Sequence, residues 1–293
     1  MEKEKTPEAD QALQMRYEKY KSILENLTIM SDAFMRNVLK KKECTEYILQ
    51  VIMEKTDLKI VEQVIQKDYK NLQGRSAVLD CVARDGENKQ FNVEIQQDNE
   101  GASPKRARYH SGLMDMNTLN PGQNFDELPE SYVIFITMDD SLGYGLPIYH
   151  IERNIREVDE KFKDESHILY VNSKIQGDTD LGRLMHDLHC KNADDMYSPV
   201  LAGRVRELKE TQEGVISMCR EMDQIYNDGI EEGKKEGKIE GKIEGKIEGK
   251  IEGKKETAIS LAEMGMPVEK IAQAVKLSVN VVQKWINESM SLV

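Results

Sequence analysis

The sequence predicts an α/β protein with an α+β-like order of elements, in which helices flank a mixed β-sheet and a helical extension follows. Three observations predict this class. Residues 75–97 alternate between polar and apolar side chains in the manner of a β-hairpin. An almost wholly apolar run at 132–138 is typical of a strand that is buried inside a sheet. From about residue 181 onward, apolar residues recur at the three- and four-residue spacing of helices.

The composition favours a globular protein and argues against a membrane or secreted protein. Hydrophobic residues make up 39% of the 293 residues and charged residues 32%, which suits a globular core with a charged helical extension. No apolar run approaches the roughly 18 residues that a membrane span needs, and the polar N-terminus is unlike a signal peptide. The four cysteines are scattered and lack CxxC spacing. We therefore expect reduced, buried thiols in a cytoplasmic protein, with neither a membrane segment nor a zinc site.

The overall charge argues against a nucleic-acid partner, whereas its local distribution argues for one. The 41 basic and 53 acidic residues give a net charge of −12, and neutralisation of phosphates supplies most non-specific affinity for DNA. Basic residues nevertheless cluster in two places, at Arg36 with Lys40–Lys42 and at Lys105, Arg106 and Arg108. We therefore expect a weak, salt-sensitive hold on DNA.

Helices are expected before the hairpin. Residues 1 to about 12 show no pattern and are expected to be irregular. Helical spacing is found at 14–27, 31–39 and 44–53. Ser31 or Asp32 can cap the second of these helices by accepting hydrogen bonds from its free backbone N–H groups. The segment 59–65 fits a helix and a strand equally well.

The register of the hairpin decides whether two of its acidic residues meet. If the DGENK loop is centred on Glu87, Asp80 lies opposite Glu94 with Cβ atoms about 5 Å apart. A slip of one residue would move these side chains to opposite faces. Two carboxylates this close repel each other unless a proton or a cation lies between them, and Mg²⁺ prefers oxygen ligands. Gln96, two residues beyond Glu94, points into the same space. The expected inward faces consist of Ala77, Leu79 and Cys81 on one arm and Phe91, Val93 and Ile95 on the other.

A basic helix is expected after the hairpin. Ser103 can cap it and Pro104 suits its first position, so we expect it to run from Pro104 to about Leu119. Arg106, Tyr109 and His110 are three and four residues apart and share one face. That face is either solvated or directed at a ligand.

Further strands and helices complete the expected domain. Strands are expected at 132–138, 149–155 and 167–172, with Asp139 and Asp140 in a turn. Residues 181–228 are expected to be helical, with caps or breaks near Asp194 and Gly214. His186, His189 and Cys190 are closely spaced, and without a second ligand pair a structural role is favoured over metal binding.

The tail contains a four-residue repeat in which IEGK occurs four times from Ile239. Each glycine costs about 1 kcal/mol relative to alanine in a helix, and a period of four places like charges at i,i+4. The favoured interpretation of 229–255 is a spacer. The alternative is assembly of a homo-oligomer through the stripe that the isoleucines and glycines of the repeat form along a helix. Residues 256–293 are expected to form a small helical unit, with helices at 257–264, 267–275 and 278–287.

Asp80, followed by Glu94, Ile95 and Gln96 on the next strand, resembles the active-site signature of the PD-(D/E)XK nuclease superfamily. The likeness is greatest to its recombination-promoting nuclease and transposase branch. SDAFMRNVL (31–39) is similar to the opening helix of that family, and PKRARYH (104–110) is similar to its basic helix. The later strands and the charged repeat add to the likeness, which covers about residues 28–255. The C-terminal unit loosely resembles a helix-turn-helix, so it either contacts DNA or serves packing.

The resemblance implies a restriction-endonuclease-like fold over residues 28–228, after an N-terminal tail and helix at 1–27. It implies a metal-dependent DNA endonuclease, associated with recombination or mobile elements, that hydrolyses phosphodiester bonds with Mg²⁺ or Mn²⁺. The implied site consists of Asp80 and Glu94 as metal ligands and catalytic residues, Gln96 as a third catalytic residue, Asp32 as a further acidic contributor, and Lys105, Arg106, Arg108 and Tyr109 as DNA contacts.

One position departs from the superfamily pattern, because Gln96 stands where the signature has a lysine. This departure and the acidic net charge favour an alternative function. The alternative is a catalytically weakened module that binds DNA or protein and assembles through the C-terminal repeat.

Overall fold

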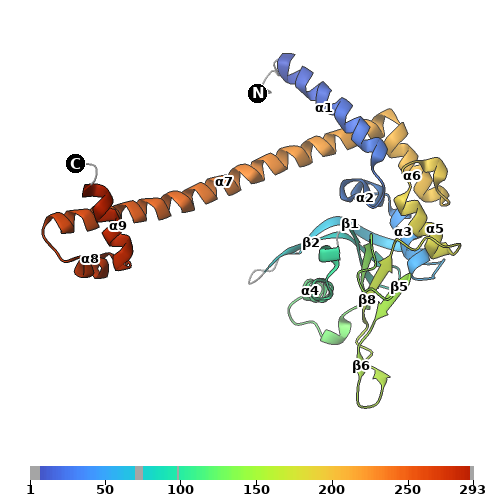
Figure 1. Cartoon of the computed structure of the whole chain (residues 1–293). Coiled ribbons are helices and arrows are strands. Elements are labelled where there is room, and N and C mark those ends of the chain that lie inside the picture. The colour runs from blue at the N-terminus through green and yellow to red at the C-terminus, as the bar shows by residue number, and fades with distance from the viewer. Residues whose placement is uncertain (1–6, 70–74, 98, 291–293) are drawn as a thin grey trace. The chain divides into compact units, whose positions relative to one another are not determined.

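The computed structural model describes residues 7–69, 75–97 and 99–290 (Figure 1). Contacts divide the chain into two compact units, Met1–Asp223 and Gln224–Val293. The first unit is a mixed sheet flanked by helices, so the predicted α/β class is confirmed. None of the described helices is both long and apolar enough to cross a bilayer.

The first unit begins with three helices. These are α1 (Pro7–Asn26), α2 (Asp32–Leu39) and α3 (Lys42–Ile52). The expectation of irregular structure up to residue 12 is wrong for residues 7–12. Proline suits the first helical position, and the residues after it include good helix formers. Residues 1–6 lie outside the described part of the chain.

In the described residues, six strands form one sheet in the order β1-β2-β3-β4-β8-β5. The strands are β1 (Ile60–Tyr69), β2 (Ala77–Asp85), β3 (Gln90–Gln96), β4 (Ser131–Thr137), β5 (Ile148–Ile151) and β8 (Ser166–Asn172). The first three form an antiparallel meander, β4 and β8 continue it in parallel, and β5 closes the edge in an antiparallel sense. Residues 59–65, whose sequence fitted a helix and a strand equally well, therefore belong to the edge strand β1 and the residue before it. The apolar run at β4 is central and buried, as predicted.

The hairpin has the register that a loop centred on Glu87 requires, because Cys81 pairs with Val93 and Ala83 with Phe91. The expected alternation fails at one place. Leu79 packs with α4 (Pro104–Met116), whereas Cys81 packs on the opposite side of the sheet. The change of face coincides with the end of the β2–β3 ladder at Cys81; the part of β2 before Cys81 pairs only with β1.

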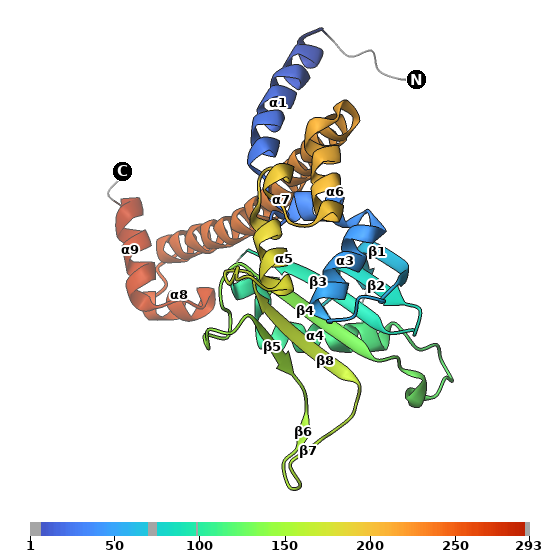
Figure 2. The ribbon, with the colours of Figure 1, turned by 90° about the vertical axis from the view of Figure 1, so that its right-hand side faces the viewer.

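Two hydrophobic cores lie on the two faces of the sheet. The larger core joins the sheet to α2, α3, α5 (Asp180–His189) and α6 (Pro199–Glu210). The smaller core joins the other face to α4. Figure 2 shows this layering, with α4 beneath the strands and α3 and α5 above them. Phe91, Val93 and Ile95 belong to the larger core, so Asn92 and Glu94 face α4.

The expected strand at 149–155 is two strands. β5 ends at Ile151, and β6 (Asn154–Ile155) instead pairs with β7 (Glu160–Lys161) in a short ribbon that extends from the sheet (Figure 2). The expected helix break near Asp194 is present as the short turn η3 (Ala193–Asp195).

The cap or break expected near Gly214 is present at Thr211, between α6 and α7 (Gln212–Glu263). Thr211 Oγ1 accepts a hydrogen bond from the Gly214 amide over 3.0 Å and so caps α7. A Cβ atom at Gly214 would lie 2.0 Å from the Glu207 carbonyl oxygen. Glycine is therefore needed here for close approach of the backbone, and it does not end a helix.

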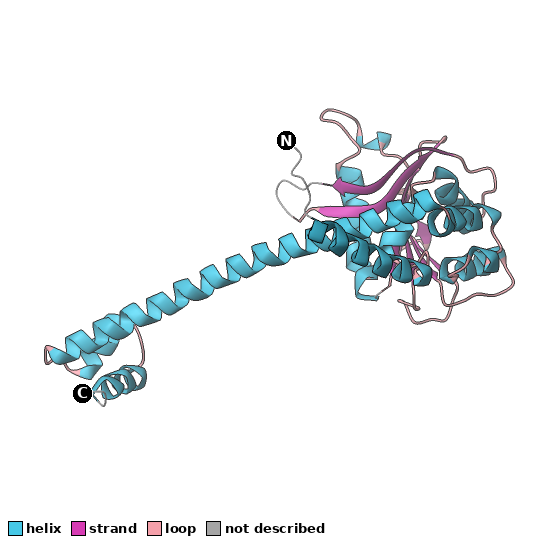
Figure 3. Cartoon of the chain, turned by 90° about the horizontal axis from the view of Figure 1, so that it is seen from above, coloured by secondary structure: helices cyan, strands magenta, loops and turns pink. Residues whose placement is uncertain are grey.

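The IEGK repeat is helical over its whole length within α7, which Figure 3 shows as one uninterrupted helix. The prediction of a separate helix at 257–264 is therefore wrong, because these residues are the last turns of α7. Met218 near its start and Ala258 near its end are buried. Packed turns at both ends supply the nucleation that the repeat lacks alone, and propagation of a helix costs less than its nucleation.

The end of α7 forms a small three-helix core with α8 (Val268–Val275) and α9 (Val279–Met290). The residues of this core are Ala258, Ile271, Ala272, Val275, Val282 and Ile286. Trp285 is partly buried against them. Division of the tail into a spacer and a helix-turn-helix unit stays a prediction.

Candidate active site

Asp80 on β2 and Glu94 on β3 come together where the ladder between their strands ends. The Asp80 backbone N–H donates a hydrogen bond to Glu94 Oε1 over 3.3 Å. The Glu94 side chain is completely buried, and Asp80 is partly exposed. The pair therefore consists of one fully buried carboxylate, Glu94, and one partly exposed carboxylate, Asp80.

The electrostatics of Asp80 show that the site holds excess negative charge. Burial, followed by the charge of Glu94 and then that of Asp32, raises the pKa of Asp80 from 3.8 to about 7. Arg36 and Arg106 oppose this shift. At neutral pH a proton or a cation is therefore bound readily at Asp80.

Four side chains surround the buried Glu94 carboxylate. Gln96 Nε2 donates to Oε2 over 3.4 Å, and Asn92 Nδ2 donates to Oε1 over 3.1 Å. The Arg106 guanidinium lies 3.6 Å from Oε2, and His110 Nδ1 lies 3.5 Å from Oε1. A buried charge needs such partners, because removal from water is costly without them.

Helix α4 brings Arg106 and His110 to the site. Ser103 caps this helix by accepting a hydrogen bond from the Arg106 amide, as predicted. Arg106 Nε donates to His110 Nε2 over 3.3 Å, so the neutral imidazole carries its proton on Nδ1, the atom that faces Glu94. His110 is buried, and its Nδ1 forms no hydrogen bond of normal geometry among the described residues.

The backbone of η1 (Asn99–Ala102) fixes the amide of Gln96. A Cβ atom at Gly101 would lie 2.1 Å from Gln96 Oε1. The absence of a side chain at Gly101 therefore leaves room for the Gln96 amide to turn its nitrogen toward Glu94.

Asp32 lies near the site but does not cap its helix. Ser31 occupies the N-cap position of α2, and Asp32 is the first helical residue. Its carboxylate accepts two hydrogen bonds from Arg36 one turn later. The prediction that Asp32 is an N-cap is therefore wrong, whereas its charge does act on Asp80.

The four predicted DNA contacts of α4 lie in different environments. Lys105 and Arg108 are exposed. Arg106 is half-buried and faces Glu94. The Tyr109 hydroxyl donates a hydrogen bond to the backbone carbonyl of Arg75 at the start of the hairpin. Arg106 is thus the member of this group that joins the carboxylate pair.

The residues present fit a hard divalent cation. Arg36 pairs with Asp32, and Arg106 lies beside Glu94. The Asp80 carboxylate, in contrast, forms no hydrogen bond or ion pair with any side chain in the described ranges. Asn92 Oδ1 is a buried acceptor that also has no partner there. Oxygen ligands with uncompensated negative charge are the donor set that Mg²⁺ or Mn²⁺ prefers.

Asn92 and His110 are the two neighbours of Glu94 that the sequence did not identify as site residues. Asn92 is two residues before Glu94 on the same strand face, and His110 is four residues after Arg106 on the same helix face. Both spacings were visible in the sequence. Contact with Glu94 could not be seen there, because it depends on where α4 lies on the sheet.

Comparison with known proteins gives one family match. A family model described as PD-(D/E)XK nuclease family transposase matches residues 33–180. The match begins in α2 and ends at the start of α5, so it includes Asp80, Glu94, Gln96 and Arg106. No curated protein and no solved structure matches the chain.

Proposed function

Because the chain belongs to the family described as PD-(D/E)XK nuclease family transposase, we propose that it is a metal-dependent DNA endonuclease that hydrolyses phosphodiester bonds. We further propose a role in recombination or in mobile elements. The observation that carries the proposal is the pair of Asp80 and Glu94, which lie just beyond the end of the β2–β3 ladder and are joined by the 3.3 Å hydrogen bond from the Asp80 amide to the Glu94 carboxylate. The uncompensated Asp80 carboxylate gives this pair its affinity for a cation.

In this proposal Asp80 and Glu94 hold Mg²⁺ or Mn²⁺, with Asp32 as a further acidic contributor. When bound, the metal supplies a water of lowered pKa and neutralises charge that builds on the phosphate. Glu94 keeps its orientation through Asn92 and His110. These polar neighbours offset part of the cost of burying the carboxylate.

Gln96 and Arg106 together take the place of the signature lysine. The Gln96 amide donates to Glu94, so it orients the carboxylate and can orient a water molecule. Arg106 supplies the positive charge that glutamine lacks, since its guanidinium lies 3.6 Å from the same carboxylate oxygen. A guanidinium is always protonated and binds phosphate well.

Lys105, Arg108 and Tyr109 are proposed to contact the DNA backbone around the site. Lys105 and Arg108 are exposed on α4, beside the turn of the helix that carries Arg106. Such contacts position the duplex without reading its sequence. The proposal therefore includes an affinity for DNA that falls strongly as the salt concentration rises.

The test is cleavage of plasmid DNA by the purified protein with Mg²⁺ or Mn²⁺. Asp80→Ala and Glu94→Ala are expected to reduce nicking by about 10³-fold or more, since metal catalysis supplies several kcal/mol. Asp139→Asn is the matched control, because Asp139 is an acidic residue at the exposed end of β4 that pairs with Lys174. Nicking that survives both alanine substitutions, or no nicking with either metal, contradicts the proposal.

A second candidate function is a binding module that assembles through α7. Ile239, Ile243, Ile247 and Ile251 are all about half exposed, with fractions of 60, 54, 53 and 49%. At 100° per residue, the lysines lie on one flank of this stripe and the glutamates on the other. A parallel pair of helices brings each Lys flank against the partner's Glu flank, whereas an antiparallel pair opposes like charges. A parallel homodimer is therefore the assembly that we propose.

A further inference from the structure

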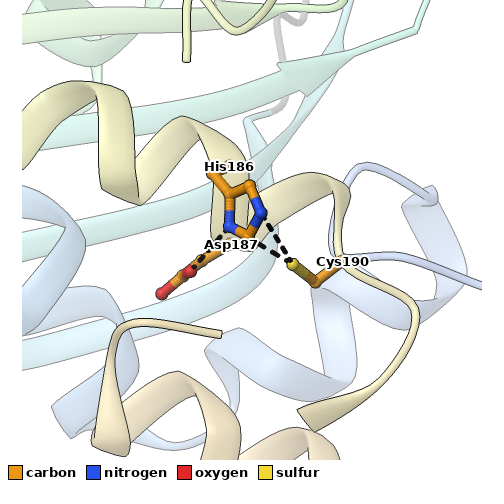
Figure 4. Close-up of side chains that lie close together, drawn as sticks. All are labelled: His186, Asp187 and Cys190. Carbon is orange, nitrogen blue, oxygen red and sulfur yellow. Dashed lines mark hydrogen bonds and ion pairs between the residues drawn. The ribbon is translucent and has the colours of Figure 1, made fainter. Parts of the chain in front are cut away.

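A second group of metal-ligating side chains lies at the end of α5, on the helical side of the first unit. It consists of His186, Asp187 and Cys190, whose ligand atoms all lie within 4.8 Å of one another (Figure 4). The sequence spacing of His186, His189 and Cys190 favoured a structural role over metal binding. The structure adds a third ligand, because Asp187 is turned toward the same place.

The distances match those between the ligands of one tetrahedral ion. His186 Nδ1 lies 3.4 Å from Cys190 Sγ and 3.4 Å from Asp187 Oδ1. Metal bonds of about 2.1–2.3 Å place tetrahedral ligands about 3.4–3.8 Å apart. The two distances from His186 Nδ1 therefore agree with those of a zinc-type site, and the third, between Cys190 and Asp187, lies within 4.8 Å.

The carboxylate of this group is held in place by the backbone. Asp187 is completely buried, and its two oxygens accept hydrogen bonds from the amides of Tyr197 and Ser198 over 2.8 and 2.7 Å. Each oxygen has two lone pairs, so Oδ1 can still bind a cation. Hydrogen-bonded carboxylates of this kind are usual among metal ligands.

The Cys190 thiol is buried, and its sulfur lies among polar atoms of neighbouring residues. The Sγ atom also lies 3.6 Å from the backbone carbonyl of Asp195. His186 is about one-third exposed, with a side-chain fraction of 35%, which gives an ion access from solvent.

We propose that His186, Asp187 and Cys190 bind one thiophilic divalent cation of the Zn²⁺ class, with water as the fourth ligand. Binding forms the metal–sulfur bond and releases the thiol proton to solvent. Thiolate and imidazole ligands exclude Mg²⁺, so this site is chemically distinct from the carboxylate pair. All three ligands lie at the end of α5, and one of them, Asp187, also holds the backbone amides of Tyr197 and Ser198 before α6.

The test is titration of the full chain with Co²⁺, which reports sulfur ligation by a thiolate-to-metal charge-transfer band. Excess Mg²⁺ is present throughout to occupy the carboxylate pair. We expect one equivalent to give the band, Zn²⁺ to abolish it by displacement, and binding to release protons and raise the thermal midpoint.

Two variants and two controls assign the ligands. Cys190→Ser is expected to remove the band, and His186→Gln to weaken binding by more than about tenfold. Asp187 is left unchanged, because its loss would also free two backbone amides. Cys219→Ser and His189→Gln are matched controls, being a buried thiol and a nearby imidazole outside the group. Circular dichroism confirms that each variant is folded.

The proposal fails on any of three results. The first is absence of the band in the folded wild-type protein, since no other observation can then support sulfur ligation. The second is a band that persists in Cys190→Ser. The third is a band that Cys219→Ser removes, which would place the ion at another thiol.

Discussion

The Asp80 amide donates a hydrogen bond to the Glu94 carboxylate, while the Asp80 carboxylate raises the electrostatic cost of that same group. The backbone therefore holds together two side chains that repel each other. A divalent cation bound by both carboxylates would relieve this repulsion.

Without divalent metal, Asp80→Asn is expected to stabilise the protein increasingly as pH rises from about 4 to about 7. The pKa of Asp80 is raised from 3.8 to about 7 in the folded state. Below 3.8 both states hold the proton. Between pH 3.8 and about 7 the Asp80 carboxyl holds its proton in the folded state but not in the unfolded state. The free energy of unfolding of the wild type therefore falls by up to about 1.4 kcal/mol per pH unit as the pH rises. Above about 7 the difference levels off. Urea unfolding of both proteins at several pH values measures this.

Magnesium supplies the control for that pH series. Mg²⁺ at pH 7–8 is expected to stabilise the wild type and to leave Asp80→Asn nearly unchanged, because ligand binding stabilises only the state that binds. Equal pH dependence of the two proteins would show that Asp80 carries no raised pKa.

Gly101→Ala is expected to reduce nicking while leaving the free energy of unfolding within about 1 kcal/mol of the wild type. The new Cβ would lie 2.1 Å from Gln96 Oε1, the movable end of a flexible side chain. The amide of Gln96 is therefore displaced from Glu94 at little cost in stability. Nicking rates and urea unfolding are the two measurements.

A double-mutant cycle shows whether the effect of Gly101→Ala acts through Gln96. In a Gln96→Ala background, Gly101→Ala should have no further effect on nicking. Gly112→Ala in α4 is the matched control, since a Cβ there meets nothing within 4 Å. It should stabilise the helix by about 0.5–1 kcal/mol without altering activity. Additive losses at Gly101 and Gln96 would refute the assigned coupling.

Arg106→Met is expected to lower the cleavage rate, whereas Arg108→Met is expected to lower the affinity for DNA. Loss of Arg106 removes a charged partner of the buried Glu94, which corresponds to about 10–100-fold in the cleavage rate. Loss of the exposed Arg108 weakens DNA binding and reduces the salt slope of the affinity by about 1, with the rate at saturating DNA unchanged. Single-turnover cleavage and binding at several salt concentrations separate the two. Similar behaviour of both variants would mean that Arg106 is only a phosphate contact.

Cross-linking tests the parallel pairing of α7. In a parallel homodimer, Ile239→Cys places the two new thiols opposite each other, so oxidation should give a covalent dimer. An antiparallel dimer would bring position 239 near 251 and leave a single Ile239→Cys uncross-linked. Replacement of all four stripe isoleucines by Gln should give monomers in analytical ultracentrifugation, since it removes the apolar surface. A dimer that survives this replacement would have to form through a surface other than these isoleucines.

The hairpin and its register could be predicted from the sequence, because alternation and turn residues are local properties. The same local signals predicted the helix capped by Ser103 and the buried strand at residues 131–137. They indicated a cap or break near Gly214, but they predicted neither the close backbone approach at Gly214 nor a continuous helix through the IEGK repeat. Gly214 serves a contact with α6, and the repeat is continued as helix from packed turns at its two ends. Neither cause is visible within a window of a few residues.

The sequence by itself therefore determined which acidic residues meet, since two strands joined by a short loop have their partners set by chain connectivity. Only the tertiary structure decided what surrounds them. Arg106 and His110 reach Glu94 because α4 packs across the sheet, and the Asp187 carboxylate is held by the backbone amides of Tyr197 and Ser198 before α6. Contacts between elements far apart in the chain depend on how whole helices pack, and no spacing along the sequence encodes that geometry.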